Sequence, residues 1–300
     1  MRKVLFLAFL FVGCFSLYHF LSSQFRFANI YFDPVYESTI RPSQEKNSEM
    51  QHILSQTFTY LDRGHQSFVF MSQDRRYVLK FFDAKRLRPS LFSSKKKIRL
   101  KMQRLFEGYE VAYLRDQANT GVLYAKLGFD PLLDKPVHCI DQFGMHHTIA
   151  LQEVPFVIQK AALPTRVLIS QILDRNEIEA AKGYFRKIIA MYVDEYQKGI
   201  YDRDRNFMYN TGFVEDRPLR MDAGRLMFNE HFKEVDLSKD LEKIVIRRAR
   251  KWLQRHYPAQ AEEIMSDLHN AIEPVAKLIC PAKSPFLGQL RPFSSANPKG

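Results

Sequence analysis

The feature that most constrains the fold of this chain is the order of its regular elements, because strands come first and helices follow. Apolar runs of strand length, separated by turn residues, fill the first half of residues 53–280. These runs are TFTYL, SFVFM, RYVLKFF, GVLYAKLG, VHCIDQF, HTIAL and PFVIQKA. Apolar residues at helical spacing interrupt them once, at 98–112, and dominate from 167 onward. Segregated strands and helices predict an α+β fold.

The amino terminus has the pattern of a targeting or anchoring segment. A short basic start precedes an apolar run from Val4 to Tyr18, and two further apolar residues bring it near the roughly 20 residues that span a bilayer. We expect residues 1–25 to form an uncleaved membrane anchor. A cleaved signal peptide, which would export the chain, is the alternative. The few flanking charges do not predict on which side of the membrane the rest of the chain lies.

Composition separates the remaining segments. Residues 26–52 are mixed and polar and are expected to form a linker, and the Pro- and Ser-containing tail at 281–300 is expected to be extended. Between them, 53–162 would form a strand-rich part and 163–280 a helix-rich part. A hydrophobic content of 46% with 25 Phe excludes a disordered protein, and three cysteines exclude a disulfide-framework scaffold.

The positive charge of the chain is concentrated in one segment. The net charge is +12, and residues 84–104 contain nine Lys and Arg and no acid. Apolar residues alternate with these cations, so the segment is a basic amphipathic insertion that fits an anionic membrane surface; a solvated helix face is the alternative. Outside it the aromatic residues do not interleave with basic ones, which argues against a nucleic-acid partner.

The strongest chemical signal lies in the segment 198–226. It contains Asp202, Asp204, Asn210 and Asp222, with a predicted short strand FMY and a hairpin turn at TGFVED. Such a hairpin would bring Asn210 and Asp222 to the same end of a two-stranded ribbon, where carboxylate and amide oxygens suit Mg²⁺. Asp204 would then accept the proton of an attacking hydroxyl. A solvated acidic loop balanced by arginines is the alternative.

Two other segments suit a nucleotide. Gly64 lies in a turn between strands, where a glycine lets backbone amides approach a phosphate, and Lys80 lies on a later strand, where it can pair with phosphate. The helix at 98–112 carries Glu110 on its apolar stripe, so Glu110 is expected to clamp Lys80, with Glu107 as the competing acid. An ordinary hairpin and a surface salt bridge are the alternatives for these two features.

In this order the segments resemble the protein-kinase-like superfamily, in an atypical, bacterial-style form. Its catalytic loop HRDxxxxN is followed by a hairpin and DFG, and GIYDRDRNFMYN and MDAG are similar to these motifs. The resemblance implies Asp202 in the His position, Asp204 as the catalytic aspartate, and Asn210, one residue late, and Asp222 as metal ligands. A second registration, like the DRH-type loop of phosphoinositide kinases, makes Asp202 the catalytic acid and Asn206 a metal ligand.

The resemblance also covers the first half of the chain. It implies that Lys80 contacts the α- and β-phosphates, that Gly64 belongs to the phosphate loop and that Glu110 is the helix partner of Lys80. FVIQKAA resembles the hinge, which would place adenine near Gln159 to Ala161. The implied fold is a two-lobed α+β fold, with a small antiparallel-sheet lobe carrying one helix and a larger helical lobe.

The implied activity is phosphoryl transfer from ATP, with Mg²⁺, to the hydroxyl group of an unknown protein, lipid or small-molecule acceptor. Two features depart from the family pattern: the phosphate loop has one glycine, and no APE motif follows MDAG. The alternative is therefore a pseudokinase that serves as a membrane-tethered nucleotide- or partner-binding module.

Overall fold

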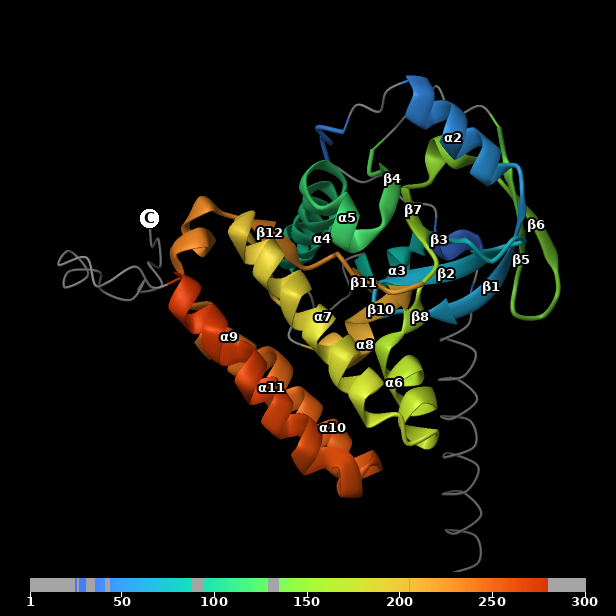
Figure 1. Ribbon diagram of the computed structural model, residues 1–300. Coiled ribbons are helices and arrows are strands. Elements are labelled where there is room, and N and C mark those ends of the chain that lie inside the picture. The colour runs from blue at the N-terminus through green and yellow to red at the C-terminus, as the bar shows by residue number, and fades with distance from the viewer. Residues whose placement is uncertain are drawn as a thin grey trace, which may run out of the picture. The chain divides into compact units, whose positions relative to one another are not determined.

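The computed structural model (Figure 1) describes residue 25 and residues 27–30, 36–40, 44–87, 94–128, 135–204 and 206–279. These residues form two compact units. The first comprises the described residues up to 171 together with 200–229, and the second comprises 172–199 and 230–279.

The two predicted terminal segments, the anchor and the tail, lie outside the described residues, apart from Phe25. Within the described ranges, no helix is long and apolar enough to cross a membrane.

A seven-stranded mixed sheet forms the body of the first unit, in the order β4–β7–β3–β2–β1–β5–β6. The strands are β1 (Thr57–Arg63), β2 (Ser67–Ser72), β3 (Tyr77–Phe82), β4 (Val122–Lys126), β5 (Val137–Ile140), β6 (His146–Ile149) and β7 (Phe156–Lys160). All seven strand predictions are confirmed. The predicted antiparallel sheet is wrong at one pair, because β1 and β5 are parallel. The long chain between them, which includes three other strands, supplies the crossover that parallel pairing requires.

The strand alternation gives the sheet two different faces. In β3, Leu79 and Phe81 join one core cluster, while Phe82 belongs to a second cluster on the other face. Lys80 shares the face of Phe82, because residues two apart on a strand point the same way. The face that carries Lys80 is therefore the face on which a site can form.

Helices cover both faces. They are the 3₁₀ turn η1 (Phe27–Asn29) and the helices α2 (Gln44–Leu54), α3 (Ala84–Leu87), α4 (Lys95–Arg115) and α5 (Gln117–Thr120). Met50 and Ile53 of α2 pack in the first cluster, and Leu105 and Tyr109 of α4 pack in the second. The expectation of a linker over 26–52 is wrong for these described residues, because apolar side chains within it are buried in the core.

Short ladders complete the first unit. One sheet has the order β11–β10–β8, and a second pairs β12 with β9. These strands are β8 (Leu163–Pro164), β9 (Ile200–Asp202), β10 (Thr211–Val214), β11 (Arg217–Arg220) and β12 (Leu226–Phe228), with the helical turn α8 (Phe207–Asn210) after β9.

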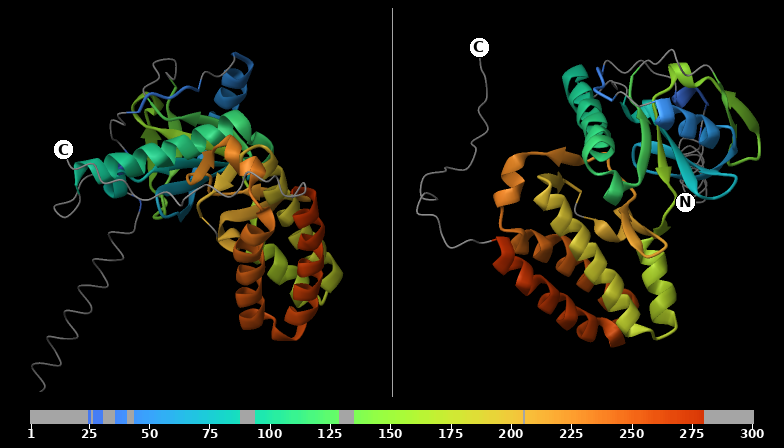
Figure 2. Two further views of the ribbon diagram at one scale, coloured as in Figure 1. Left: turned by 90° about the vertical axis from the view of Figure 1, so that its left-hand side faces the viewer. Right: turned by 45° about the horizontal axis from the view of Figure 1, so that its top comes forward.

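The second unit is helical, as the periodicity predicts (Figure 2). Helix α6 (Thr165–Asp174) begins in the first unit, and the second unit contains α7 (Ile178–Gln197), η3 (Glu230–Glu234), α9 (Leu237–Leu241), the π-helical turn η4 (Glu242–Ile246), α10 (Arg247–His256) and α11 (Pro258–Ile279). Helix α11 packs against both α7 and α10. Lys182 of α7 bonds to Glu263 of α11 at 2.6 Å, so charged pairs border the apolar contact.

Candidate functional site

The acid-rich segment folds as a helical turn followed by a β-hairpin. The Asn206 carbonyl oxygen accepts hydrogen bonds from the Tyr209 and Asn210 amides at 3.1 and 3.0 Å. This closes α8, so the predicted strand FMY is wrong and is replaced by one helical turn. A hairpin does form, but its first arm is β10, which the prediction placed in the turn; Thr211 lies opposite Arg220.

The hairpin brings Asn210 and Asp222 together. The Asn210 carbonyl oxygen accepts from the Met221 amide at 2.7 Å and from the Asp222 amide at 3.3 Å. The two residues therefore lie at the same end of the ribbon, which confirms the geometry that the turn at TGFVED predicts.

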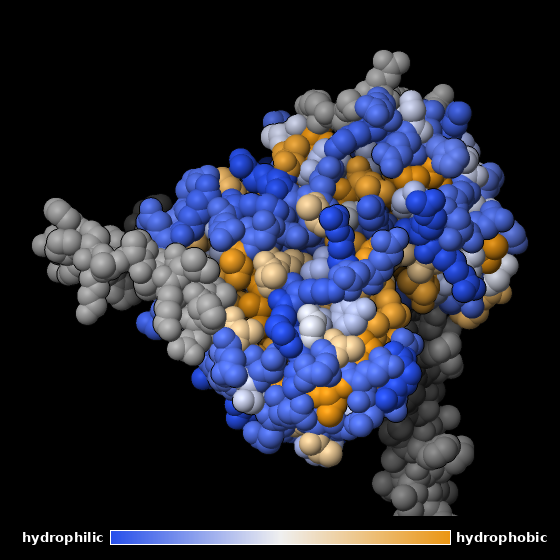
Figure 3. All heavy atoms as spheres, in the orientation of Figure 1, coloured by the Kyte–Doolittle hydropathy of each residue, from blue (hydrophilic) through white to orange (hydrophobic). Residues whose placement is uncertain are grey.

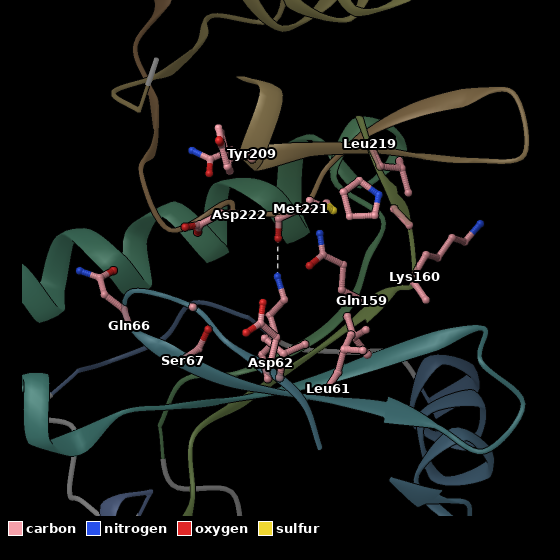
Figure 4. A pocket seen from close by; sticks show the side chains of 18 of the residues that line it. Leu61, Asp62, Gln66, Ser67, Gln159, Lys160, Tyr209, Leu219, Met221 and Asp222 are labelled. Atoms are coloured by element: carbon pink, nitrogen blue, oxygen red, sulfur yellow. Dashed lines mark hydrogen bonds between the residues drawn. The ribbon is translucent and has the colours of Figure 1, made fainter. Parts of the chain in front are cut away.

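A cavity of about 700 Å³ lies in the first unit beside this end of the ribbon (Figure 4). Figure 4 shows Met221 and Asp222 on one side of the cavity, with Asp62 and Ser67 on the other. Seven of the predicted site residues line it: Gly64, Lys80, Gln159, Ala161, Asp204, Asn210 and Asp222. Three predicted residues, Glu110, Asp202 and Asn206, are not in its lining.

Lys80 is the buried cation of the cavity. Its side chain is 6% exposed, and Nζ donates a hydrogen bond to the Met221 carbonyl oxygen, drawn as the dashed line in Figure 4. Burial lowers the pKa of Lys80 to about 8, an effect that the nearby Asp222 carboxylate opposes. The lysine thus lies beside the backbone that carries Asp222, within the cavity that the sequence assigns to phosphate.

Glu110 does not clamp Lys80. Its carboxylate accepts from the Tyr36 hydroxyl at 2.6 Å and from the Ser38 hydroxyl at 3.0 Å, and also from the Thr39 amide and hydroxyl at 2.5 and 3.1 Å. The predicted contact is therefore wrong. Glu110 holds the segment 36–40 against α4 instead. The competing acid, Glu107, accepts from the Gln103 amide at 2.8 Å.

The rotation of α4 explains this correction. Successive residues on an α-helix point about 100° apart, and α4 turns Leu105 and Tyr109 toward the cavity. Gly108 packs against the backbone of Ala223, the residue after Asp222. A Cβ atom at position 108 would be only 2.6 Å from the Ala223 carbonyl oxygen. Because this contact fixes the rotation of α4, Glu110 does not face the cavity. Sequence analysis missed Gly108, although a glycine inside a long helix is a signal of close packing.

Asp202 is buried and does not line the cavity. It is 2% exposed and forms an ion pair with Arg220, which is fully buried. Its Oδ1 accepts from the Asp204 amide at 2.7 Å. Burial raises the pKa of Asp202 to about 6, against the opposing effect of Arg220. Asp202 therefore positions the backbone of Asp204, and a direct catalytic role has no support in this geometry.

Asp204 and Asn210, and not Asp202 and Asn206, reach the cavity. Asp204 Oδ1 accepts from the Asn206 amide at 3.2 Å, and Oδ2 lies 3.6 Å from Arg225 Nη1. Of the two registrations that the sequence leaves open, the geometry favours the one with Asp204 and Asn210.

The pair Asn210 and Asp222 fits a hard cation. Asp222 Oδ1 accepts from the Gly224 amide at 3.1 Å, and the side-chain amide of Asn210 has a buried nitrogen without a hydrogen-bond partner among the described residues. Rotating that amide would bring its oxygen to the same position. The described chain holds no group of three or more His, Cys, Asp or Glu arranged for a metal. Mg²⁺, which binds through one or two protein oxygens plus water and phosphate, is the ion that this pair suits.

Gln159 has a defined orientation at the end of β7. Its Nε2 donates to the Thr120 and Arg220 carbonyl oxygens at 2.5 and 2.7 Å. Two acceptors flank this atom, so it must be the nitrogen. Oε1 is buried and has no hydrogen-bond partner within the described ranges. Gln159 thus lines the cavity with a side chain whose buried oxygen lacks a donor.

No protein-family model and no curated protein matches the chain. Solved structures of the bifunctional kinase-methyltransferase WbdD do match: one at 13% identity and a TM-score of 0.35, over 71% of this chain and 43% of that chain. A second WbdD structure matches at 14% identity and a TM-score of 0.34, over 73% and 45%. The chain spans less than half the length of WbdD, and no activity is transferred on this likeness.

Proposed function

We propose that the chain is an ATP- and Mg²⁺-dependent phosphotransferase of the two-lobed protein-kinase-like type. One observation carries the proposal: Lys80, Asp204, Asn210 and Asp222, which come from separate segments, line one cavity. Its volume of about 700 Å³ lies within the range of roughly 300–1,000 Å³ for small-molecule sites. A buried lysine beside two carboxylates and an amide suits a bound nucleotide triphosphate.

Each residue has a role in this proposal. Lys80 would release the Met221 carbonyl oxygen and pair with the α- and β-phosphates. Asn210 and Asp222 would hold Mg²⁺, whose charge neutralises the phosphate oxygens when it is bound. Fixed charges in a buried cavity lower the barrier because they need no rearrangement during the reaction.

Asp204 would accept the proton. The acceptor hydroxyl oxygen forms a bond to the γ-phosphorus, the bond from that phosphorus to the β-phosphate oxygen breaks, and ADP leaves. The hydroxyl proton passes to the Asp204 carboxylate. Asp202 keeps Asp204 in place through the backbone hydrogen bond, and Arg220 keeps Asp202 charged.

A MgATP titration followed by product analysis tests the proposal. At about 100 times the dissociation constant, ATP should stabilise the chain by roughly 2.7 kcal/mol in a thermal unfolding assay. Mass spectrometry after incubation with labelled ATP and candidate acceptors should then detect phosphorylated product. Stabilisation without turnover would favour the pseudokinase, which the bond between Lys80 and the Met221 carbonyl oxygen also favours. No stabilisation would contradict the phosphotransferase and the nucleotide-binding pseudokinase, and would leave only a partner-binding module.

We predict that Gln159 selects the nucleobase. Its Oε1 has no partner among the described residues and is shielded from solvent, so nucleotide binding must expose it before it can accept from the exocyclic amine of adenine and repel the carbonyl oxygen that guanine carries at the same position. In Gln159→Leu, the preference for ATP over GTP should fall by about tenfold or more, the value of one hydrogen bond to a buried group. Competition binding with both nucleotides measures the ratio. Gln51→Leu, the same substitution at an exposed position of α2 outside the cavity lining, is the control and should keep the wild-type ratio.

The basic insertion remains a proposed membrane contact. It includes α3 and the start of α4, where Lys96, Lys97 and Arg99 are exposed. Together with the predicted anchor, these cations support a location at an anionic membrane surface.

A further inference from the structure

The hairpin of β5 and β6 ends in two exposed apolar side chains. Phe143 and Met145 are 61% and 60% exposed, the highest values among the large hydrophobic residues that the structure describes. Gly144 separates them, with a φ of +79°, so the backbone turns sharply and both side chains flank the same tip. Figure 3 shows apolar surface at the edge of the first unit where this hairpin lies.

The tip is held rigidly. Asp141 Oδ1 accepts from the Phe143 and Met145 amides at 2.8 and 3.0 Å, and Asp141 Oδ2 lies 2.8 Å from His147 Nε2. The Gly144 amide donates to the Asp141 carbonyl oxygen at 3.0 Å. The hydrogen bonds of the turn therefore hold the two apolar side chains in exposed positions. Apolar side chains that are exposed together in this way mark an interaction site.

The hairpin lies where the amino-terminal segment joins the fold. Gln142 Nε2 donates to the Phe25 carbonyl oxygen at 3.4 Å, and the ring of Phe25 contacts those of Phe68, Phe70 and His147. The apolar run of the sequence ends at Leu21, four residues earlier.

The hairpin exposes no acid, and Lys135 beside it is its one exposed cation when the histidines are neutral. Between 135 and 149 the chain carries Lys135 and three histidines, of which His138 and His146 are exposed. The one acid in this stretch is Asp141, which is buried and paired with His147. No exposed acid of the hairpin would therefore oppose negatively charged headgroups.

We infer that the tip of the β5–β6 hairpin inserts Phe143 and Met145 into the interface of an anionic phospholipid bilayer. Aromatic and apolar side chains at that depth add buried apolar area to the hold of a membrane anchor. The insertion would fix which way the first unit faces relative to the bilayer. The inference rests on the predicted bilayer location of Val4–Leu21 and is independent of phosphoryl transfer.

Quenching of a tryptophan reporter tests the inference. The chain has one tryptophan, so Trp252→Phe gives a silent background for Phe143→Trp in the full-length chain. The chain is reconstituted in vesicles of phosphatidylcholine and phosphatidylglycerol, with and without brominated acyl chains. The reporter at 143 should emit at shorter wavelength than in detergent and should be quenched by the brominated lipid, as expected for an interfacial tryptophan. Met145→Trp should behave alike.

Leu114→Trp in the same background is the matched control. Leu114 is 52% exposed on α4, which contacts β4, the strand at the opposite edge of the sheet from β6. Six strand spacings, roughly 29 Å, separate the two edges. Three results would overturn the inference: no quenching at 143 while the chain floats with the vesicles, equal quenching at 114, or no flotation. A blue shift at 143 in detergent that grows with protein concentration would also overturn it, in favour of a second copy.

Discussion

Asp222→Ala is expected to abolish phosphoryl transfer and to remove the stabilisation that MgATP gives to the wild-type chain. Asp222 lines the cavity beside Lys80. In the proposed mechanism Asp222 and Asn210 would supply the protein's oxygen ligands for the metal. Without this carboxylate, the phosphates and Lys80 remain but the metal loses its charged ligand. At 100 times the wild-type dissociation constant, the stabilisation of about 2.7 kcal/mol should fall to near zero. Thermal unfolding with and without MgATP measures it.

Asp216→Ala provides the control. Asp216 lies in the exposed turn of the same hairpin, so its removal changes the net charge equally without touching the cavity. Its MgATP response and turnover should match the wild type. If Asp222→Ala transferred phosphate at the wild-type rate, the assignment of the metal site, and with it the proposed mechanism, would be wrong.

Arg220→Met is expected to destabilise the fold by about 3–5 kcal/mol at pH 8, the usual cost of leaving one member of a buried ion pair without its partner. Arg220 and Asp202 are both buried, and the guanidinium is the cation that faces the Asp202 carboxylate. Urea denaturation followed by circular dichroism measures the loss. Arg217→Met, at the exposed end of β11, should change stability by at most about 0.5 kcal/mol.

The free energy of unfolding that Arg220→Met loses should be smaller at low pH. The pKa of Asp202 is raised to about 6 in the folded chain, so the folded state binds more protons than the unfolded state between about pH 4 and pH 6. The free energy of unfolding that Asp202 contributes therefore falls as the pH rises through this window. In Arg220→Met the pKa rises further, so at pH 5 Asp202 is neutral and most of the penalty disappears.

The double variant Asp202→Asn with Arg220→Met separates the charge from the packing. With no buried charge left, it should recover most of the stability lost at pH 8, and its stability should lack the fall between pH 4 and pH 6. An Arg220→Met penalty that is the same at pH 5 and pH 8 would contradict the buried ion pair as its cause.

Local patterns predicted the elements near the site but not every contact among them. The seven strands follow from short apolar runs between turn residues, and the approach of Asn210 and Asp222 follows from a hairpin of a few residues. The strand FMY was wrong because three residues are too few to distinguish a strand from a helical turn. The parallel pairing of β1 with β5 depends on distant segments, which no local pattern encodes.

Glu110 shows the difference between what helix periodicity predicts and what tertiary packing decides. The periodicity of α4 predicts that one side is buried, but neighbouring residues differ by about 100°, and a stripe does not say which of them faces a cavity. The close contact of Gly108 with the Ala223 backbone turns Tyr109 inward. The segment 36–40, expected as linker, then occupies Glu110.

The sequence by itself determined the α+β class, the strands, the hairpin and a set of candidate site residues, because these depend on residue type and short-range spacing. Only the tertiary structure decided that Asp204 and Asn210, not Asp202 and Asn206, face the cavity, and that Asp202 pairs with Arg220. The tertiary structure also decided that Glu110 binds the segment 36–40. These outcomes depend on burial and on packing between distant elements, which set the direction of each side chain after the backbone has formed.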